Sequence, residues 1–159
     1  MPQDNNREML RHTLATLAYR AGKTLRGAPA EFAQFRVGDH GRTSGEILAH
    51  MGDLMDWALS IAKSKQEWHD SPVLAWEDGC TRFFRSVQAL DDYLASEEAL
   101  GCASEKLFQG PIADALTHTG QLAMLRRLAG SSIKGENYFK AEIVEGRVGE
   151  DQAVPRREF

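Results

Sequence analysis

Cysteine is scarce in this sequence. Of its 159 residues only Cys80 and Cys102 are cysteines, and they form no Cys-x-x-Cys pair. Two widely spaced thiols do not make a disulfide framework and favour reduced side chains in a reducing compartment. Cys80 falls on an apolar stripe and is expected to be a small core residue, whereas Cys102 lies in a loop with no basic side chain beside it to activate its thiol.

Long apolar runs are also missing. No segment approaches the roughly 18 consecutive apolar residues that a membrane-spanning helix requires. The first residues, MPQDNNREMLRH, contain no apolar stretch of the kind found in secretory signal peptides. We therefore expect a cytosolic protein without a membrane partner.

An excess of positive charge is absent as well. Lys and Arg together number 19 and Asp and Glu 23, which gives a net charge of −4. The basic residues are scattered among acidic ones along every segment, whereas a protein that binds nucleic acid normally presents a basic face. DNA and RNA are therefore not expected partners. The hydrophobic content of 42% is ordinary for a globular protein of this length, which matches a single domain.

The dominant pattern in the sequence is helical periodicity. Apolar residues recur at steps of three and four, and no stretch shows the sustained two-residue alternation of a β-strand. The first predicted helix covers about residues 5–25 and the third about residues 76–94. Their apolar stripes are formed by Leu10, Leu14, Leu17, Ala21 and Leu25, and by Trp76, Cys80, Phe83, Val87, Leu90 and Leu94. The sequence therefore predicts an all-α protein.

Local start signals bound the other two predicted helices. Thr43 followed by Glu46 is a capping box and predicts that the second helix begins there and continues to about Lys63. Gly110 and Pro111 predict the start of the fourth helix, because proline at the first helical position is pre-set in φ and loses no needed donor. This helix is predicted to end at about Gly130.

Four amphipathic helices of similar length can bury their stripes together as a four-helix bundle. We expect residues 1–145 to form this single domain, with the segment after Gly130 packed across the helices as a C-terminal extension. Residues 146–159 are rich in charge and are expected to form a polar, flexible tail.

Three residues on these helices are candidate metal ligands. His50 lies one turn from both Ile47 and Leu54 and so projects toward the flank of the apolar stripe of the second helix. On the fourth helix Asp114 and His118 are four residues apart and share a face. An inward carboxylate needs a counter-charge, hydrogen bonds or a cation, because leaving an ionised Asp unpaired away from water costs several kcal/mol.

This spacing leaves two interpretations open. In one, His50, Asp114 and His118 together bind a divalent metal, since two imidazoles and one carboxylate suit Zn²⁺, Ni²⁺ or Fe²⁺ and leave positions open for water or substrate. Asp53, three residues after His50, is a reserve ligand. In the other, Asp114 and His118 form an ion pair on the helix surface and His50 is a histidine satisfied at a helix interface.

Two segments carry a family resemblance. GEILAHMGDLMDWAL, residues 45–59, and DALTHTGQLAMLRRLAG, residues 114–130, followed by ENYF, resemble the second and fourth helices of DinB-like, DNA-damage-inducible proteins. The layout of four helical segments agrees with that family over most of the chain. The resemblance implies an up-down-down-up bundle and a homodimer.

The resemblance also implies a ligand set for a divalent metal. Members of the family typically use three histidines, two of which match His50 and His118; the third position is Asp114 in this sequence, which replaces one type of ligand by another. Gln121 would then orient a ligand or a bound water through its amide. Trp57, two turns beyond His50, and Tyr138 would line the same cavity.

The activity that the resemblance implies is a metal-dependent reaction of a low-molecular-weight thiol, as in an S-transferase, or a hydrolysis. A bound metal lowers the pKa of a thiol as Zn²⁺ does that of water. The alternative is a non-catalytic, stress-associated or small-molecule-binding bundle in which the metal is structural or absent. Fold-level analogy does not choose between the two.

Overall fold

The structure, a computed structural model, describes residues 4–159, and within this range it is helical with no β-strand beyond one isolated bridge between Glu136 and Glu158. Four long helices dominate it: α1 (Asn5–Leu25), α2 (Ser44–Ala62), α3 (Trp76–Ala95) and α5 (Ala113–Leu128). The prediction of an all-α protein is confirmed.

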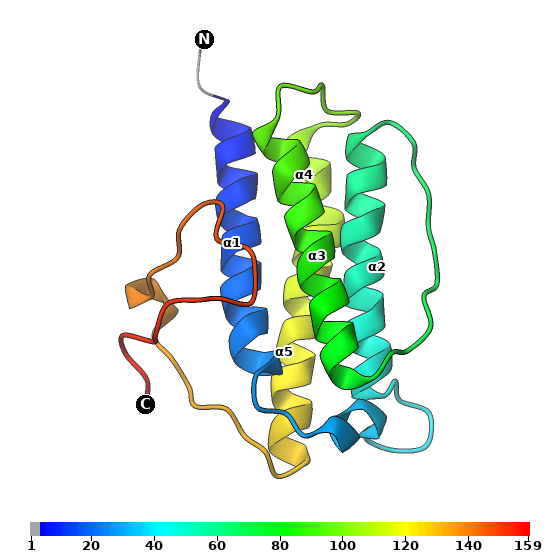
Figure 1. The fold of residues 1–159 in the computed structure, drawn as a ribbon, viewed down its shortest axis with the longest axis vertical. Coiled ribbons are helices and arrows are strands. Elements are labelled where there is room, and N and C mark those ends of the chain that lie inside the picture. The colour runs from blue at the N-terminus through cyan, green and yellow to red at the C-terminus, as the bar shows by residue number, and fades with distance from the viewer. Residues whose placement is uncertain (1–3) are drawn as a thin grey trace.

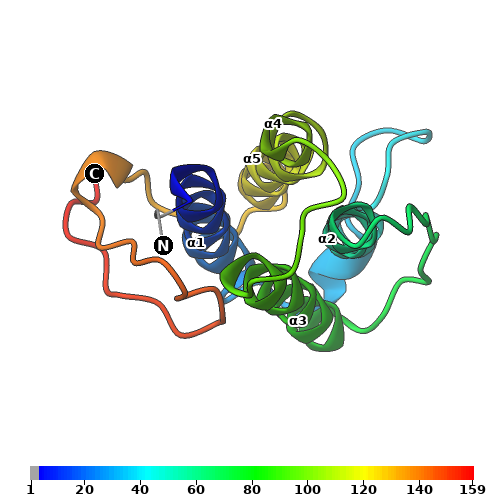
Figure 2. The same ribbon diagram turned by 90° about the horizontal axis from the view of Figure 1, so that it is seen from above.

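The four long helices lie roughly alongside one another (Figure 1). In this view α1 and α5 run from top to bottom, and α2 and α3 run from bottom to top. From above, each helix has two neighbours: α3 and α5 both pack against α1 on one side and α2 on the other (Figure 2). The apolar stripes therefore face a common interior.

The core contains the predicted stripes of the first and third helices. All the residues of both stripes are buried, and Leu14, Leu17, Phe83, Val87 and Leu90 have no exposed surface. Burying a side chain of this size stabilises the folded state by about 1.5–3 kcal/mol. Burial, aided by the nearby charges of Glu77 and Glu150, also raises the pKa of the Cys80 thiol to about 12, so this cysteine is an inert core residue.

The start of α2 is fixed by the predicted capping box. The Thr43 hydroxyl accepts a hydrogen bond from the backbone N–H of Glu46 at 3.1 Å, and the Glu46 carboxylate accepts one from the backbone N–H of Thr43 at 2.8 Å. His50 follows Thr43 by seven residues and so lies about two turns into α2.

The predicted start of the fourth helix at Gly110 and Pro111 is wrong. The chain is already helical in α4 (Ser104–Leu107), continues through a π-helical turn at Phe108–Ile112, and then enters α5. Proline lacks an N–H and its ring crowds the carbonyl four residues earlier, so it breaks a regular α-helix. The wider π turn accommodates Pro111 without ending the helical stretch.

The C-terminal segment lies along α1, on the side away from α2 (Figures 1 and 2). It contains one short helical turn, Tyr138–Lys140, and contributes Val148, which is fully buried in the core. Residues 146–159, for which we expected a flexible tail, therefore contact the helices more extensively than their polar composition indicated.

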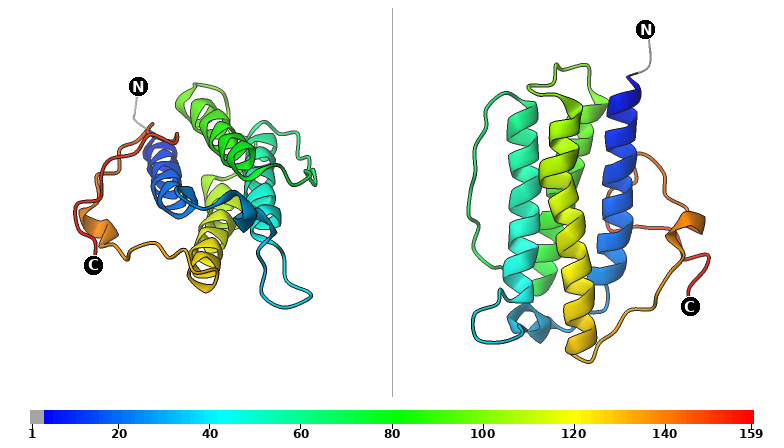
Figure 3. Two further views of the ribbon diagram at one scale, coloured as in Figure 1. Left: turned by 60° about the horizontal axis from the view of Figure 1, so that its bottom comes forward. Right: turned by 180° about the vertical axis from the view of Figure 1, so that it is seen from behind.

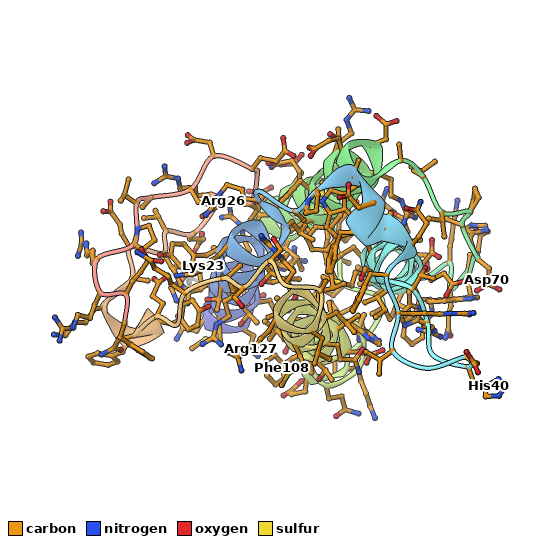
Figure 4. All side chains as sticks on the ribbon, turned by 90° about the horizontal axis from the view of Figure 1, so that it is seen from below. Lys23, Arg26, His40, Asp70, Phe108 and Arg127 are labelled. Atoms are coloured by element: carbon orange, nitrogen blue, oxygen red, sulfur yellow. The ribbon has the colours of Figure 1, made fainter. Side chains whose placement is uncertain are left out.

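A buried polar cluster joins this segment to α1. The Glu136 carboxylate accepts hydrogen bonds from Tyr19 Oη at 2.5 Å and from Lys23 Nζ at 2.7 Å, and Lys23 also pairs with Glu158 at 2.8 Å. Figure 4 shows Lys23 projecting from α1. Burial and the hydrogen bond to Glu136 raise the pKa of Tyr19, so its hydroxyl remains a donor at neutral pH.

No helix among residues 4–159 is long and apolar enough to cross a lipid bilayer.

We expect Glu136→Ala to reduce the free energy of unfolding by about 3 kcal/mol, because it leaves Lys23 with Glu158 alone and the Tyr19 hydroxyl without its acceptor. Glu142→Ala is the matched control, since Glu142 pairs with Arg156 at an exposed site and its loss should cost about 1 kcal/mol or less. Urea unfolding monitored by circular dichroism measures both. Equal effects of the two substitutions would contradict a role for Glu136 in holding the C-terminal segment.

Candidate metal site

The three predicted ligands come together between two neighbouring helices. His50 projects from α2, and Asp114 and His118 project from α5, which lies beside α2 when the molecule is seen from behind (Figure 3). One ligand atom from each residue can be chosen so that all three lie within 4.8 Å of one another. The two helices therefore bring together residues that are 64 positions apart in the sequence, from His50 to Asp114.

The individual distances centre on the carboxylate. Nε2 of His50 lies 3.7 Å from Oδ2 of Asp114, and Nε2 of His118 lies 3.4 Å from Oδ1 of the same carboxylate. The two imidazole rings are nearly perpendicular, with their centroids 4.8 Å apart. Both histidines thus direct a ring nitrogen toward Asp114.

The site lies at the edge of the helix interface. The exposed fractions of the side chains are 12% for His118 and 19% for His50, but 47% for Asp114. The carboxylate is more exposed than an inward position implied, so its ionised form carries no large desolvation cost. The two imidazoles are thus partly buried, and one side of the group is accessible to solvent.

Gln121 contacts the ring nitrogen of His118 that faces away from Asp114. Its Oε1 lies 2.7 Å from Nδ1 of His118, and with the amide oriented in this way Nδ1 must carry the proton. On the other side of the ring, Nε2 faces the Asp114 carboxylate at 3.4 Å. A cation between them would stabilise this arrangement. We predicted that Gln121 would orient a ligand or a bound water, and its contact in the structure is with the candidate ligand His118.

The electrostatic environment keeps His50 neutral. Burial, the positive charge of Arg42 and the neighbouring His118 lower the pKa of His50 from its ordinary value of 6.5, and the opposing effect of Asp114 is smaller. His50 is therefore uncharged at pH 7, and its contact with Asp114 is not an ion pair there. A neutral imidazole is the form that binds a metal.

The geometry fits a first-row divalent ion. Ligand atoms bound at about 2.0–2.2 Å in a tetrahedral site lie about 3.3–3.6 Å apart. The separations of 3.4 Å and 3.7 Å, one to each oxygen of Asp114, approach this range, and one ligand atom from each residue lies within 4.8 Å of the other two. Three protein ligands would leave a fourth position free.

Two of the other predicted site residues lie elsewhere. Asp53, the reserve ligand, accepts hydrogen bonds from Ser71 and from Arg82 of α3 and does not join the triad. Tyr138 packs edge-on against Tyr19, with the Arg20 guanidinium 4.1 Å from its ring centre, on the outer side of α1. Neither prediction anticipated these partners, because each partner belongs to a segment distant in the sequence.

The aromatic side of the site differs from the prediction. The residue that contacts His50 is Trp68, in the connection between α2 and α3, with ring centres 5.5 Å apart. Trp57, which we predicted to line the site, packs edge-on against Trp68 at 5.9 Å and so stands behind it. Trp68 lies in a polar stretch without periodicity, so no sequence pattern pointed to it.

Two of the remaining histidines, His69 and His40, lie outside the triad. His69 is two-thirds exposed in the connection after α2 and approaches only Glu67. His40 projects from the tip of the loop before α2, away from the helices (Figure 4).

Comparisons of the chain with protein-family models, with curated proteins and with solved structures found no match.

We expect Arg42→Ala to raise the pKa of His50 toward 6.5, because it removes a positive charge that disfavours protonation. Asp114→Asn should lower this pKa below the wild-type value, because it removes the negative charge that favours protonation. NMR titration of the imidazole resonances in metal-free protein measures both shifts. Arg36→Ala, at an exposed arginine in the same loop, is the control and should leave the pKa of His50 unchanged. A wild-type His50 that titrates at or above 6.5 would contradict the described environment.

Proposed function

We propose that this chain binds a divalent metal ion through His50, Asp114 and His118. The observation that carries the proposal is the convergence of their three ligand atoms from two helices within 4.8 Å. The approach of His118 Nε2 to the Asp114 carboxylate at 3.4 Å supports it, as does the neutral state of His50.

We further propose that the chain is a DinB-like protein and that its four long helices form the family's up-down-down-up bundle. The order and directions of the helices in Figure 1 are compatible with this topology. The match of His50 and His118 to two of the family's ligand positions also supports it. Asp114 at the third position keeps a side chain that can bind a metal, so the departure from three histidines alters the ligand set without removing a ligand.

The ligand set favours Zn²⁺, Ni²⁺ or Fe²⁺. Two imidazoles and one carboxylate are donors of intermediate softness, which these ions accept, whereas Mg²⁺ and Ca²⁺ prefer oxygen donors only. The net charge of the group with a divalent ion would be about +1, since the imidazoles are neutral and the carboxylate contributes one negative charge. A small anionic ligand would then be favoured at the free position.

The reaction that fits this site is S-transfer from a low-molecular-weight thiol, or a hydrolysis. A bound divalent ion would supply the acidification of a thiol or a water at neutral pH. The residues of this chain would provide the rest: Gln121 would hold the proton of His118 on Nδ1, and the solvent-facing side of Asp114 would leave an approach for the substrate.

A non-catalytic small-molecule-binding protein is the second candidate, and one cavity favours it. A cavity of about 180 Å³ lies between α2, α3 and their connection, lined by Leu48, Ala49, Pro72, Leu74 and Trp76 among others, and it does not include the triad. In this case the metal would be structural. Retention of a bound thiol or water at the metal distinguishes the enzyme from this alternative.

We also propose that the protein forms a homodimer. Large apolar side chains are exposed on the outer faces of α1 and of the α4–α5 stretch: Met9, Phe108, Met124 and Leu128. A second copy of the chain would remove them from water.

We expect the purified, metal-free protein to bind one equivalent of Zn²⁺ or Ni²⁺, and His50→Ala, Asp114→Ala and His118→Ala each to weaken binding by more than about 100-fold. Loss of a ligand should exceed the 10- to 100-fold cost typical of losing a ligand's hydrogen-bond partner. Calorimetric titration against a competing chelator, with metal content by mass spectrometry, measures this.

His69→Ala is the matched control, because His69 is an exposed histidine outside the triad, and it should bind as the wild type does. A wild-type protein that takes up no metal after reconstitution would exclude the proposed site. Equal loss in the His69 variant would assign the binding to surface histidines instead.

A further inference from the structure

The connection between α2 and α3 runs along the outside of α2 and carries Trp68 onto the candidate metal site. This connection is the long loop at the right of Figure 1, and it lies beside α2 in both views of Figure 3. Trp68 is 40% exposed, so part of its ring contacts His50 and part remains open. An exposed tryptophan next to three candidate ligands is an available binding surface.

Two anchors hold the loop on either side of Trp68. Before it, the backbone N–H of Glu67 donates to Ser60 Oγ of α2 at 3.0 Å. After it, Ser71 donates twice to Asp53 of α2, from its backbone N–H at 3.0 Å and from its hydroxyl at 2.6 Å. Trp68 is therefore held between two points of attachment to the same helix.

The second anchor is part of a charged network. Nη2 of Arg82 donates to Asp53 and to Asp56, each at 2.7 Å, while Nη1 donates to the backbone carbonyl of Ala49 at 2.8 Å. Arg82 reaches this position across Gly52, where a Cβ atom would lie 2.0 Å from Nη1. Glycine at position 52 therefore leaves room for Arg82 of α3 to hold Asp53, the carboxylate that accepts the hydrogen bonds of Ser71.

The orientation of the indole ring is fixed as well. Its N–H donates to Asp70 at 3.0 Å, and Asp70 projects to the outer side of the loop (Figure 4). Trp57 supports the ring edge-on from α2 at 5.9 Å. With its polar edge occupied and its ring supported, Trp68 presents apolar surface beside the triad.

We infer that Trp68 is the specificity-determining wall of the triad, and that the site takes small molecules in which an anionic donor, such as a thiolate, carries a planar apolar group. This inference rests on the proposed function. The donor is selected by the positive charge of the metal-bound group, and the planar group by the indole. Aromatic contacts of this geometry contribute about a two- to tenfold preference beyond the area they bury.

Ser71 acts as a positioning residue in this arrangement. It does not contact the triad, but its two hydrogen bonds to Asp53 place the backbone three residues beyond Trp68. Loss of its hydroxyl should therefore weaken the selection of planar ligands without weakening the binding of metal.

The test uses Co²⁺-substituted protein, with thiol binding followed by the visible absorption of the ion. The probes are phenylmethanethiol and ethanethiol. We expect Trp68→Ala to weaken phenylmethanethiol binding about two- to tenfold and to leave ethanethiol and Co²⁺ binding unchanged, while Trp68→Phe keeps the aromatic preference. Val73→Ala, at an exposed apolar residue of the same loop, is the control and should match the wild type.

Ser71→Ala should lose part of the aromatic preference with Co²⁺ affinity intact, and Ser71→Thr should restore it. Trp68→Ala protein that binds Co²⁺ and keeps the full preference for phenylmethanethiol would overturn this inference alone. Wild-type protein that binds no Co²⁺ would overturn the proposed function and this inference with it.

Discussion

The packing of α2 against α5 is the interaction on which the candidate site depends. Neither helix holds a complete set of ligands, since His50 belongs to one and the pair of Asp114 and His118 to the other. Fully buried residues adjoin the ligands on both helices: Met51 follows His50, and Ala115 and Leu122 flank His118. The burial that stabilises the core therefore also sets the separation of the ligands, and a shift of α2 by one residue would direct His50 elsewhere.

Polar networks with partners distant in the sequence complete the structure around this core. The network of Asp53, Ser71 and Arg82 holds the connection after α2, and the cluster of Lys23 and Glu136 holds the C-terminal segment on α1. Both contain charged groups that are buried or partly buried and that receive hydrogen bonds, so removing one member would leave another without compensation. The first network matters for function because the loop that it holds carries Trp68.

The sequence predicted the parts of the structure that depend on local patterns. Periodicity identified the stripes of α1 and α3, the capping box placed the start of α2, and the spacing of Asp114 and His118 placed them on one face. Local patterns do not predict contacts between distant segments. Asp53 was predicted to be a reserve ligand because its partners, Ser71 and Arg82, follow it by 18 and 29 residues and share no sequence pattern with it. The sequence also predicts a helix start at Pro111, where the structure has a π turn, because a π turn leaves no pattern in the sequence.

X-ray absorption spectroscopy of the Zn²⁺-loaded protein tests the central claim most directly, because it reports the atoms bound to the ion. The account predicts two imidazole ligands, visible by their multiple scattering, together with oxygen donors, all at about 2.0–2.2 Å. The spectrum of the His50→Ala variant should show one imidazole fewer. A spectrum with oxygen donors alone, or one that is unchanged by the loss of His50, would contradict the claim that α2 and α5 together form the metal site.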